Sequence, residues 1–353
     1  MKNRRDPVIV GIADAPLEDG KFVTKASVLG HAALVAKAAV EEAGLTLDDV
    51  DGLLTAGMWG VPGPGQLATV TLGEYLGIMP TFVDGTNIGG SAFEAHVAHA
   101  AMALREGYCE VALIVYSSDQ KSLRSRNLGG RPSVLSMQHE TPYGMPTPVG
   151  GYAMAAQRHM HEYGTTSENL AEIAVATRKW AQLNPDATRR DPLSVDEVLS
   201  STMISEPLHL LDCCLVTDGA GAIVMTTAER AKDLKSKPVA VKGYGEAHTH
   251  WAIGEMPDLA RLLPAQKAGE RAMKMAGVSH SDIDVVEIYD SFTITVLLTL
   301  EALGFCKFGE GGDFVSGQRT APGGAFPMNT SGGGLSALHP GMFGMLLLIE
   351  AVR

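Results

Sequence analysis

Two pairs of matching stretches occur in the same order in the two halves of this 353-residue chain. The first pair is A-G-L-T-L-D-D-V-D-G-L from Ala43 and A-G-V-S-H-S-D-I-D-V-V from Ala276. The second pair is N-I-G-G-S-A from Asn87 and N-T-S-G-G-G from Asn329. The first stretch joins a helix to a strand in each half, and the second precedes a run of small residues. These repeats predict a duplicated α/β unit.

The rest of the chain alternates between short apolar runs and amphipathic or small-residue runs. We expect strands over 7–13, 50–56, 81–84, 110–117, 219–226, 238–246 and 285–289. We expect helices over 27–43, 67–76, 89–105, 151–163, 167–183, 260–275, 292–303 and 342–352. The alternation favours a mainly parallel sheet with helices on its faces. Three segments follow: an N-terminal half (1–117), an insertion over the core and the site (118–206), and the remainder (207–353).

Composition and charge restrict the class of protein. Hydrophobic residues make up 45% of the chain, which is enough for a large core. The net charge is -12 and no Lys/Arg-rich run occurs, so nucleic acid or an anionic membrane is not expected as the main partner. No stretch reaches the ~18 apolar residues that span a bilayer. The apolar run from Val8 to Ile12 is too short for a secretion signal, and we expect a cytoplasmic protein.

The cysteines and histidines predict no metal site. The four cysteines form no C-x-x-C pair, and we expect free or buried thiols in a reducing compartment. His96 and His99 would share one helix face, but their neighbours are apolar or small, which favours packing over metal binding.

The two glycine turns are the candidate centre of the site. Asn329 to Gly341 reads N-T-S-G-G-G-L-S-A-L-H-P-G, and an apolar helix-like run follows. Glycines allow close backbone approach, and a helix N-terminus offers free N–H groups to an oxyanion. His339 could donate a hydrogen bond or carry a proton there. A duplicated unit would bring the turns at Gly89 and Gly332 together, lining one active site. The alternative is a structural glycine turn beside a satisfied histidine.

Further motifs complete a resemblance to a known family. They are A-A-Q-R-H-M-H-E-Y-G-T-T at 155–166, L-L-D-C-C-L-V-T-D-G-A-G-A at 210–222 and E-I-Y-D-S-F-T at 287–293. Together with the glycine-rich stretch and its H-P-G, they resemble the thiolase superfamily over nearly the whole chain, and especially sterol-carrier-protein-type thiolases and thiolase-like lipid-transfer proteins. The resemblance implies the thiolase fold, with duplicated βαβαβαββ halves in a five-layered α-β-α-β-α arrangement. It also implies a homodimer joined through the edge of the core sheet.

The position of the family's nucleophile is vacated in this chain. Thiolases carry a Cys-x-Ser-Gly motif at the start of a helix in the first half, and the matching residues are Gly89, Gly90, Ser91 and Ala92. Covalent acyl transfer needs a thiolate or an equivalent nucleophile, which glycine cannot supply. Ser91 is a weak substitute because no base is evident beside it, and capping or packing is its expected role.

Two other family positions retain polar groups. The Asn-Glu-Ala-Phe motif, or its His-Asp variant, matches 289–292, so the oxygen-binding residue is replaced by Tyr289. A phenol can donate a hydrogen bond or transfer a proton, although a buried tyrosine with a satisfied hydroxyl is the alternative. Asp290 is expected to orient its neighbours or to cap the next helix. His339 matches the His-Pro histidine that binds the thioester oxygen. The family's late Cys-x-Gly loop has no counterpart before Arg353.

Loss of the nucleophile with retention of oxyanion groups predicts acyl-CoA chemistry without a covalent intermediate. The resemblance implies retro-aldol cleavage of a β-hydroxyacyl-CoA, with Tyr289 as base and with His339 and a backbone N–H near Gly89 or Gly332 stabilising the enolate. It also implies an OB-fold partner of the DUF35 type. Two alternatives stay open: an acetyl-CoA acetyltransferase or thiolase-type acyltransferase, and a non-catalytic subunit that binds acyl-CoA or lipid.

The expected substrate is a coenzyme A thioester, and no bound cofactor is expected. By the resemblance, CoA would lie along the insertion, where Arg124, Arg126 and Arg131 are candidate phosphate contacts. The alternative for these arginines is a solvated surface.

Overall fold

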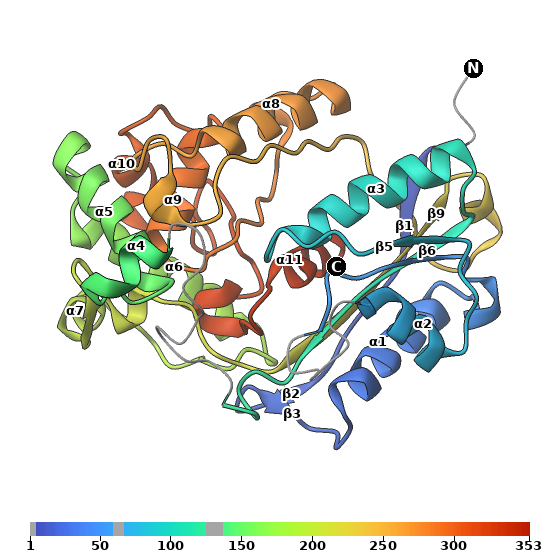
Figure 1. Cartoon of the computed structure of the whole chain (residues 1–353). Coiled ribbons are helices and arrows are strands. Elements are labelled where there is room, and N and C mark those ends of the chain that lie inside the picture. The colour runs from blue at the N-terminus through green and yellow to red at the C-terminus, as the bar shows by residue number, and fades with distance from the viewer. Residues whose placement is uncertain (1–4, 59–66, 125–136) are drawn as a thin grey trace. The chain divides into compact units, whose positions relative to one another are not determined.

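The computed structural model describes residues 5–58, 67–124 and 137–353, which form two compact units (Figure 1). The first unit consists of Met1–Ser125, Val216–Tyr244 and His339–Arg353. The second consists of Arg126–Leu215 and Gly245–Leu338. The consecutive segments 1–117, 118–206 and 207–353 divide the chain by its repeats rather than by compactness, and that division stays a prediction.

The first unit is built on a six-stranded sheet of order β10-β1-β9-β6-β4-β5. Its strands are β1 (Pro7–Asp14), β4 (Gly52–Leu54), β5 (Phe82–Asp84), β6 (Val111–Ser118), β9 (Gly219–Thr227) and β10 (Val239–Ala240). β4 runs parallel to β5 and β6, whereas β9 runs antiparallel to both β1 and β6, and β1 runs antiparallel to β10. The expectation of a mainly parallel sheet is therefore wrong. β9 enters after a long intervening segment, so no βαβ crossover fixes its direction.

Helices cover both faces of this sheet (Figure 1). α1 (Val28–Glu42) and α2 (Ala68–Leu76) lie on one face, and α3 (Ala92–Glu106) and α11 (Gly344–Val352) lie on the other. α1 begins at Ser27, whose hydroxyl accepts the Gly30 N–H at 3.1 Å. Gly11 on β1 allows the backbone of α1 to approach, because a Cβ there would overlap the Ala39 carbonyl oxygen. A short hairpin, β2 (Leu17–Glu18) with β3 (Lys21–Phe22), completes the unit's regular structure.

The second unit is mainly helical. Its helices are α4 (Met137–Glu140), α5 (Val149–Tyr163), α6 (Ser167–Leu183), α7 (Val195–Ser200), α8 (Leu263–Ala276), α9 (Thr293–Ala302), α10 (Gly311–Val315) and the π-helix η9 (Gly333–Ala337). A two-stranded ribbon pairs β7 (Met203–Ser205) with β8 (Leu208–His209). The core gathers around the largely buried α9, against which α5 and α6 pack. None of the described helices in either unit combines the length and apolarity required to cross a bilayer.

The strand expected over 285–289 is wrong in this unit. Only a single parallel bridge, between Val286 and Met328, forms there among the described residues. Beyond it, the side chain of Asn329 replaces the backbone of a partner strand. Its Oδ1 accepts the Ile288 N–H at 2.8 Å, and its Nδ2 donates to the Ile288 carbonyl at 2.9 Å. The backbone polar groups of Ile288 are therefore satisfied by the side chain of a loop residue and not by a neighbouring strand.

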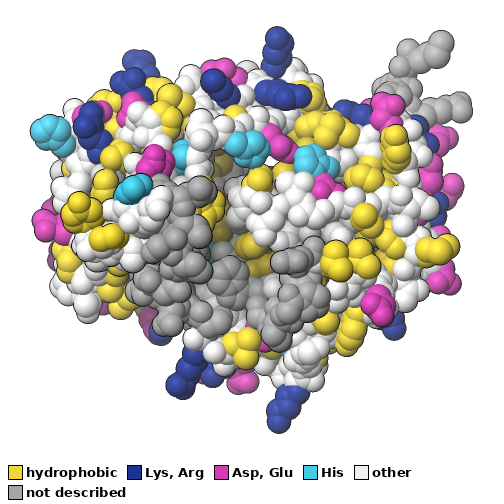
Figure 2. All heavy atoms as spheres, in the orientation of Figure 1, with side chains coloured by type: hydrophobic (Ala, Val, Ile, Leu, Met, Phe, Trp, Pro, Cys, Tyr) yellow, Lys and Arg dark blue, Asp and Glu magenta, His cyan; other side chains and the backbone are white. Residues whose placement is uncertain are grey.

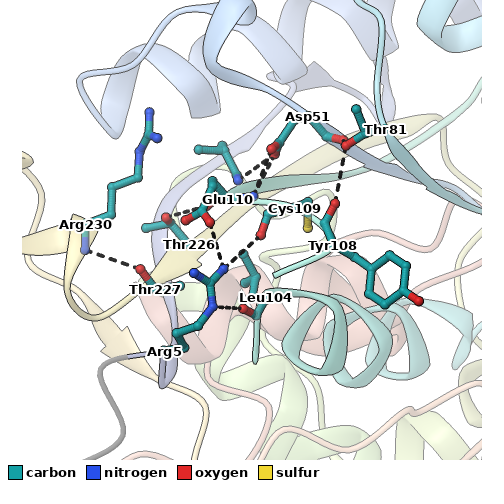
Figure 3. A network of polar contacts seen from close by, with 11 residues as sticks. Arg5, Asp51, Thr81, Leu104, Tyr108, Cys109, Glu110, Thr226, Thr227 and Arg230 are labelled. Atoms are coloured by element: carbon teal, nitrogen blue, oxygen red, sulfur yellow. Dashed lines mark hydrogen bonds and ion pairs between the residues drawn. The ribbon is translucent and has the colours of Figure 1, made fainter. Parts of the chain in front are cut away.

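Polar contacts fix the edge of the first unit where α3 leads into β6 (Figure 3). The Asp51 carboxylate accepts the N–H groups of Glu110 and Val111 at 2.8–2.9 Å. Arg5 donates to the Leu104 carbonyl at 2.6 Å and to the Glu110 carboxylate at 2.8 Å. These contacts hold the C-terminal end of α3 against the sheet, so its N-terminal end at the Gly89 turn is placed by a firmly anchored helix.

Candidate active site

The Gly89 turn leads directly into α3 in the first unit. The Asn87 side chain organises it, donating to the Ala56 carbonyl at 2.8 Å and accepting the Gly89 N–H at 3.1 Å. Gly89 has a φ of +84°, and its carbonyl accepts the Ala92 N–H at 3.0 Å. A Cβ added at Gly89 would meet no atom within 4 Å. The vacated nucleophile position is thus open in space, and its backbone conformation favours glycine.

Free backbone donors lie at this turn. Within the part of the chain that the structure describes, the N–H groups of Gly90 and Ser91 make no hydrogen bond. Ser91 is exposed, and its hydroxyl does not cap α3, so the capping role expected from the sequence is wrong. Unsatisfied N–H groups at a helix N-terminus carry partial positive charge and suit an oxyanion.

His339 lies in the same unit and is held by the segment that leads into β9. It is buried, its backbone N–H donates to the Thr217 hydroxyl at 3.0 Å, and the Thr217 N–H donates to its carbonyl at 3.2 Å. The Tyr116 hydroxyl donates to the Pro340 carbonyl at 2.6 Å and accepts the Met342 N–H at 3.2 Å. These contacts fix the His-Pro-Gly segment from both sides. The sequence showed the histidine, but not the residues that hold its segment: Thr217, just before β9, and Tyr116 in β6.

The same segment connects His339 to the Gly89 turn. The imidazole lies 5.8 Å from the Phe343 ring, centroid to centroid. The next residue, Gly344, donates its N–H to the Gly90 carbonyl at 3.2 Å. His339 and the free N–H groups of the α3 N-terminus therefore belong to one locally connected structure.

The Gly332 turn in the second unit is fully satisfied. Gly332 has a φ of +97° and donates its N–H to the Asn329 carbonyl at 2.9 Å, and Gly333 donates to the Ser331 hydroxyl at 3.2 Å. The next two N–H groups, those of Gly334 and Leu335, donate to the Asp290 carboxylate at 2.7 and 3.1 Å. The donors expected near Gly332 are thus all engaged. An oxyanion role for this turn stays a prediction, and it requires one of these bonds to open.

Tyr289 is tied to that turn through both of its neighbours. Ile288 is held by the Asn329 amide, and the completely buried Asp290 holds the start of the π-helix. Burial raises the pKa of Asp290 to about 6, although the Gly334 and Leu335 N–H groups lower it. The orienting role expected for Asp290 is thus visible in its contacts. Tyr289 itself is half-buried, and its role as a base stays a prediction.

The predicted site residues therefore form two local groups. Gly89 and His339 lie in the first unit, and Tyr289 and Gly332 lie in the second. A single site that contains both groups stays a prediction. Arg124 is exposed at the end of a described stretch, whereas Arg126 and Arg131 lie outside the described residues.

The described residues include no reactive thiol at the vacated position. Cys109 is buried in the network of Figure 3, and burial, with Asp51 and Glu110 nearby, raises its pKa to about 12. Burial also raises the pKa of Cys306 to about 12, so both thiols stay protonated at neutral pH. No group of three or more His, Cys, Asp or Glu side chains that could hold a metal occurs within the described ranges.

Comparisons with known proteins agree with these motifs. A family model described as thiolase C-terminal domain-like matches residues 245–353. The chain is 35% identical over 327 residues to 17-hydroxy-3-oxo-4-pregnene-20-carboxyl-CoA lyase of Mycobacterium tuberculosis, covering 89% of this chain and 83% of that protein. It is 31% identical over 358 residues to acetyl-CoA acetyltransferase of Methanothermobacter thermautotrophicus, covering 99% and 90%. The solved Ltp2-ChsH2(DUF35) aldolase matches with a TM-score of 0.88 at 33% identity, covering 99% of this chain and 90% of that one.

Proposed function

Because this chain belongs to the thiolase superfamily, we propose that it catalyses retro-aldol cleavage of a β-hydroxyacyl-CoA. Its membership confirms the predicted thiolase fold and the broad prediction of an acyl-CoA enzyme that makes or breaks a carbon–carbon bond. The products would be a ketone or aldehyde and a shorter acyl-CoA. One observation carries this choice of reaction: the nucleophile position is Gly89, with open space around it and no thiol.

The proposed chemistry divides between the two groups of residues. Tyr289 acts as its phenolate and accepts the proton of the β-hydroxyl, and the bond between the α- and β-carbons breaks as the carbonyl forms. The electron pair of that bond becomes an enolate on the shorter thioester. His339 and the free N–H groups at the start of α3 stabilise the enolate oxygen, where negative charge develops. The substrate is a CoA thioester, and Arg124 is a candidate phosphate contact, together with Arg126 and Arg131.

A protein partner belongs to this proposal. The solved relative that supports it is named as an Ltp2-ChsH2(DUF35) aldolase, and we expect an OB-fold protein of the DUF35 type to act with this chain.

A homodimer is also proposed. β5 is one of the two edge strands of its sheet, and hydrophobic side chains gather on the surface over α2 and β5 in Figure 2. Val70, Met79 and Val83 are exposed there, and such a patch beside a sheet edge suits an interface between copies.

The test is a mass-spectrometric assay of the purified chain with and without a DUF35 protein. One substrate is a β-hydroxyacyl-CoA with a tertiary alcohol, and the other is a β-ketoacyl-CoA with free CoA. Cleavage of the hydroxy ester alone, reduced at least 100-fold in Tyr289→Phe, is the expected result. Tyr108→Phe, at an exposed tyrosine just after α3, is the matched control. Binding of both esters without turnover would instead identify a non-catalytic subunit.

The acetyltransferase similarity supports one second candidate. The Methanothermobacter relative covers 99% of this chain, so an acyltransferase completed by a residue from another chain is the alternative. Thiolysis of the β-keto ester in the same assay would establish that alternative and overturn the retro-aldol proposal.

A further inference from the structure

Glu94 is a carboxylic acid that the sequence motifs do not single out. It lies in the first turn of α3, five residues after Gly89. A Cβ added at Gly344 would overlap both of its carboxyl oxygens and the Gly90 carbonyl oxygen. The Glu94 carboxyl therefore packs against Gly344, between the Gly89 turn and the segment that carries His339.

The carboxyl is not used as a helix cap. An acidic residue at the third helical position usually accepts the N–H of the N-cap residue. Asp49, Glu197 and Asp282 do this in the same protein, with Thr46, Ser194 and Ser279 as their N-cap residues. Glu94 does not accept the N–H of Ser91, which is the N-cap residue of α3, and the Ser91 side chain makes no capping bond either. Its Oε2 is buried and accepts no hydrogen bond within the described parts of the chain, although the residue as a whole is partly exposed.

Burial changes the acid strength of this group. It raises the pKa of Glu94 to about 7, against the effect of its own backbone N–H. At neutral pH the carboxyl is then present in both its protonated and its ionised form. A group in that state can both give and accept a proton, which is the property of an efficient general acid–base residue.

The proposed reaction lacks one component that such a group would supply. After the bond between the α- and β-carbons breaks, the enolate keeps the electron pair and its α-carbon needs a proton. Tyr289 has taken the hydroxyl proton on the other fragment. We propose that Glu94 is the acid that protonates the α-carbon of the enolate, which rests on the retro-aldol function proposed above. The Glu94 O–H bond breaks and the new C–H bond forms. Solvent then returns a proton to Glu94 and takes from Tyr289 the proton that it gained.

Deuterium exchange tests this step without the cleavage step. The protein with its DUF35 partner is incubated with acetyl-CoA in deuterium oxide, and deuterium in the acetyl group is followed by mass spectrometry. Glu94 in its ionised form should remove an α-proton and return a deuteron. The expected result is exchange by the native protein and a loss of at least 100-fold in Glu94→Gln. Tyr289→Phe should lose cleavage but keep exchange, because its hydroxyl acts on the other fragment.

Glu94→Asp separates proton transfer from folding. It keeps the carboxyl one methylene shorter, so partial exchange, above that of Glu94→Gln, is expected in a variant of similar thermal stability. Exchange by Glu94→Gln at the native rate would overturn the proposal, as would the absence of exchange in the native protein. If the native protein exchanges through Glu94 but cleaves no hydroxy ester, the retro-aldol function fails while the role of Glu94 in α-proton transfer stands.

Discussion

The turns at Gly89 and Gly332 arise from matching stretches of sequence but differ in how they are built. At Gly332, every N–H from Gly332 to Leu335 has a protein acceptor, and a Cβ would lie 2.5 Å from the Ala181 Cβ. At Gly89, two N–H groups are free among the described residues and a Cβ would meet nothing. The Gly332 turn is tightly packed and fully hydrogen-bonded, whereas the Gly89 turn has open space and free backbone donors.

This difference indicates that the two repeated turns have different roles. The satisfied turn holds the Tyr289 segment in place through Asp290 and Asn329. The open turn offers donors and space where the family's covalent nucleophile would stand. A retro-aldol reaction needs both: a firmly placed base, and a site that stabilises negative charge without forming a bond to carbon.

Removal of the Asp290 carboxylate should have the largest effect on the Gly332 turn and on the stability of the protein. Asp290→Ala leaves two buried N–H groups without acceptors and creates a cavity, so we expect a loss of about 4 kcal/mol in the free energy of unfolding. Urea denaturation at pH 8 measures this loss. Asp290→Asn keeps one acceptor oxygen and should lose about half as much. A loss below about 1 kcal/mol in Asp290→Ala would show that the turn does not depend on this carboxylate.

A matched pair of alanine substitutions compares the turns directly. Gly332→Ala places a Cβ against the backbone of Ala181 at a positive φ, and we expect a loss of about 3 kcal/mol. Gly89→Ala adds only the conformational strain of a positive φ in open space, or about 1 kcal/mol. Thermal unfolding of both variants under one condition measures the difference. Equal losses would contradict the distinction between a packed and an open turn.

Glu94 gives the open turn a stability that depends on pH. Its pKa is raised in the folded state to about 7, so the folded protein binds this proton more tightly than the unfolded chain does. The stabilisation that this proton gives to the folded protein is therefore complete below the pKa of the unfolded chain, near 4.5. It is lost as the pH rises through the folded pKa of about 7. Chemical denaturation of both proteins at pH 5 and pH 8 measures this effect. Between pH 5 and pH 8, the free energy of unfolding of Glu94→Gln should rise by about 2 kcal/mol relative to that of the native protein. An unchanged difference between the two proteins would contradict the raised pKa.

The smallest effect on stability is expected outside both turns. Arg124 is exposed, so Arg124→Ala should change the free energy of unfolding by less than about 0.5 kcal/mol. If its guanidinium contacts a CoA phosphate, the KM for the thioester should rise several-fold with kcat unchanged. Lys25→Ala, at another exposed cation of the same unit, is the control and should leave KM unchanged. An unchanged KM in Arg124→Ala would assign this arginine to the solvated surface.

The sequence predicted local elements better than the contacts that connect them. β6, β9 and α6 follow the expected ranges closely, because long apolar or amphipathic runs define them locally. The 285–289 run did not become a strand, since its partner is the side chain of Asn329 rather than another strand. The sequence did not predict Glu94 as a site residue, because an acidic residue in the first turn of a helix normally indicates capping. Only its packing against Gly344 distinguishes it, and that contact joins residues 250 positions apart.

The proposed reaction proceeds without a covalent acyl-enzyme. Intact-protein mass spectrometry during turnover of the tertiary β-hydroxyacyl-CoA, with the DUF35 partner present, tests it most directly. We expect an unmodified protein mass at every time point while the ketone and the shorter acyl-CoA accumulate. An acyl adduct that forms and decays at the rate of turnover would contradict it, and peptide mapping of that adduct would identify the nucleophile.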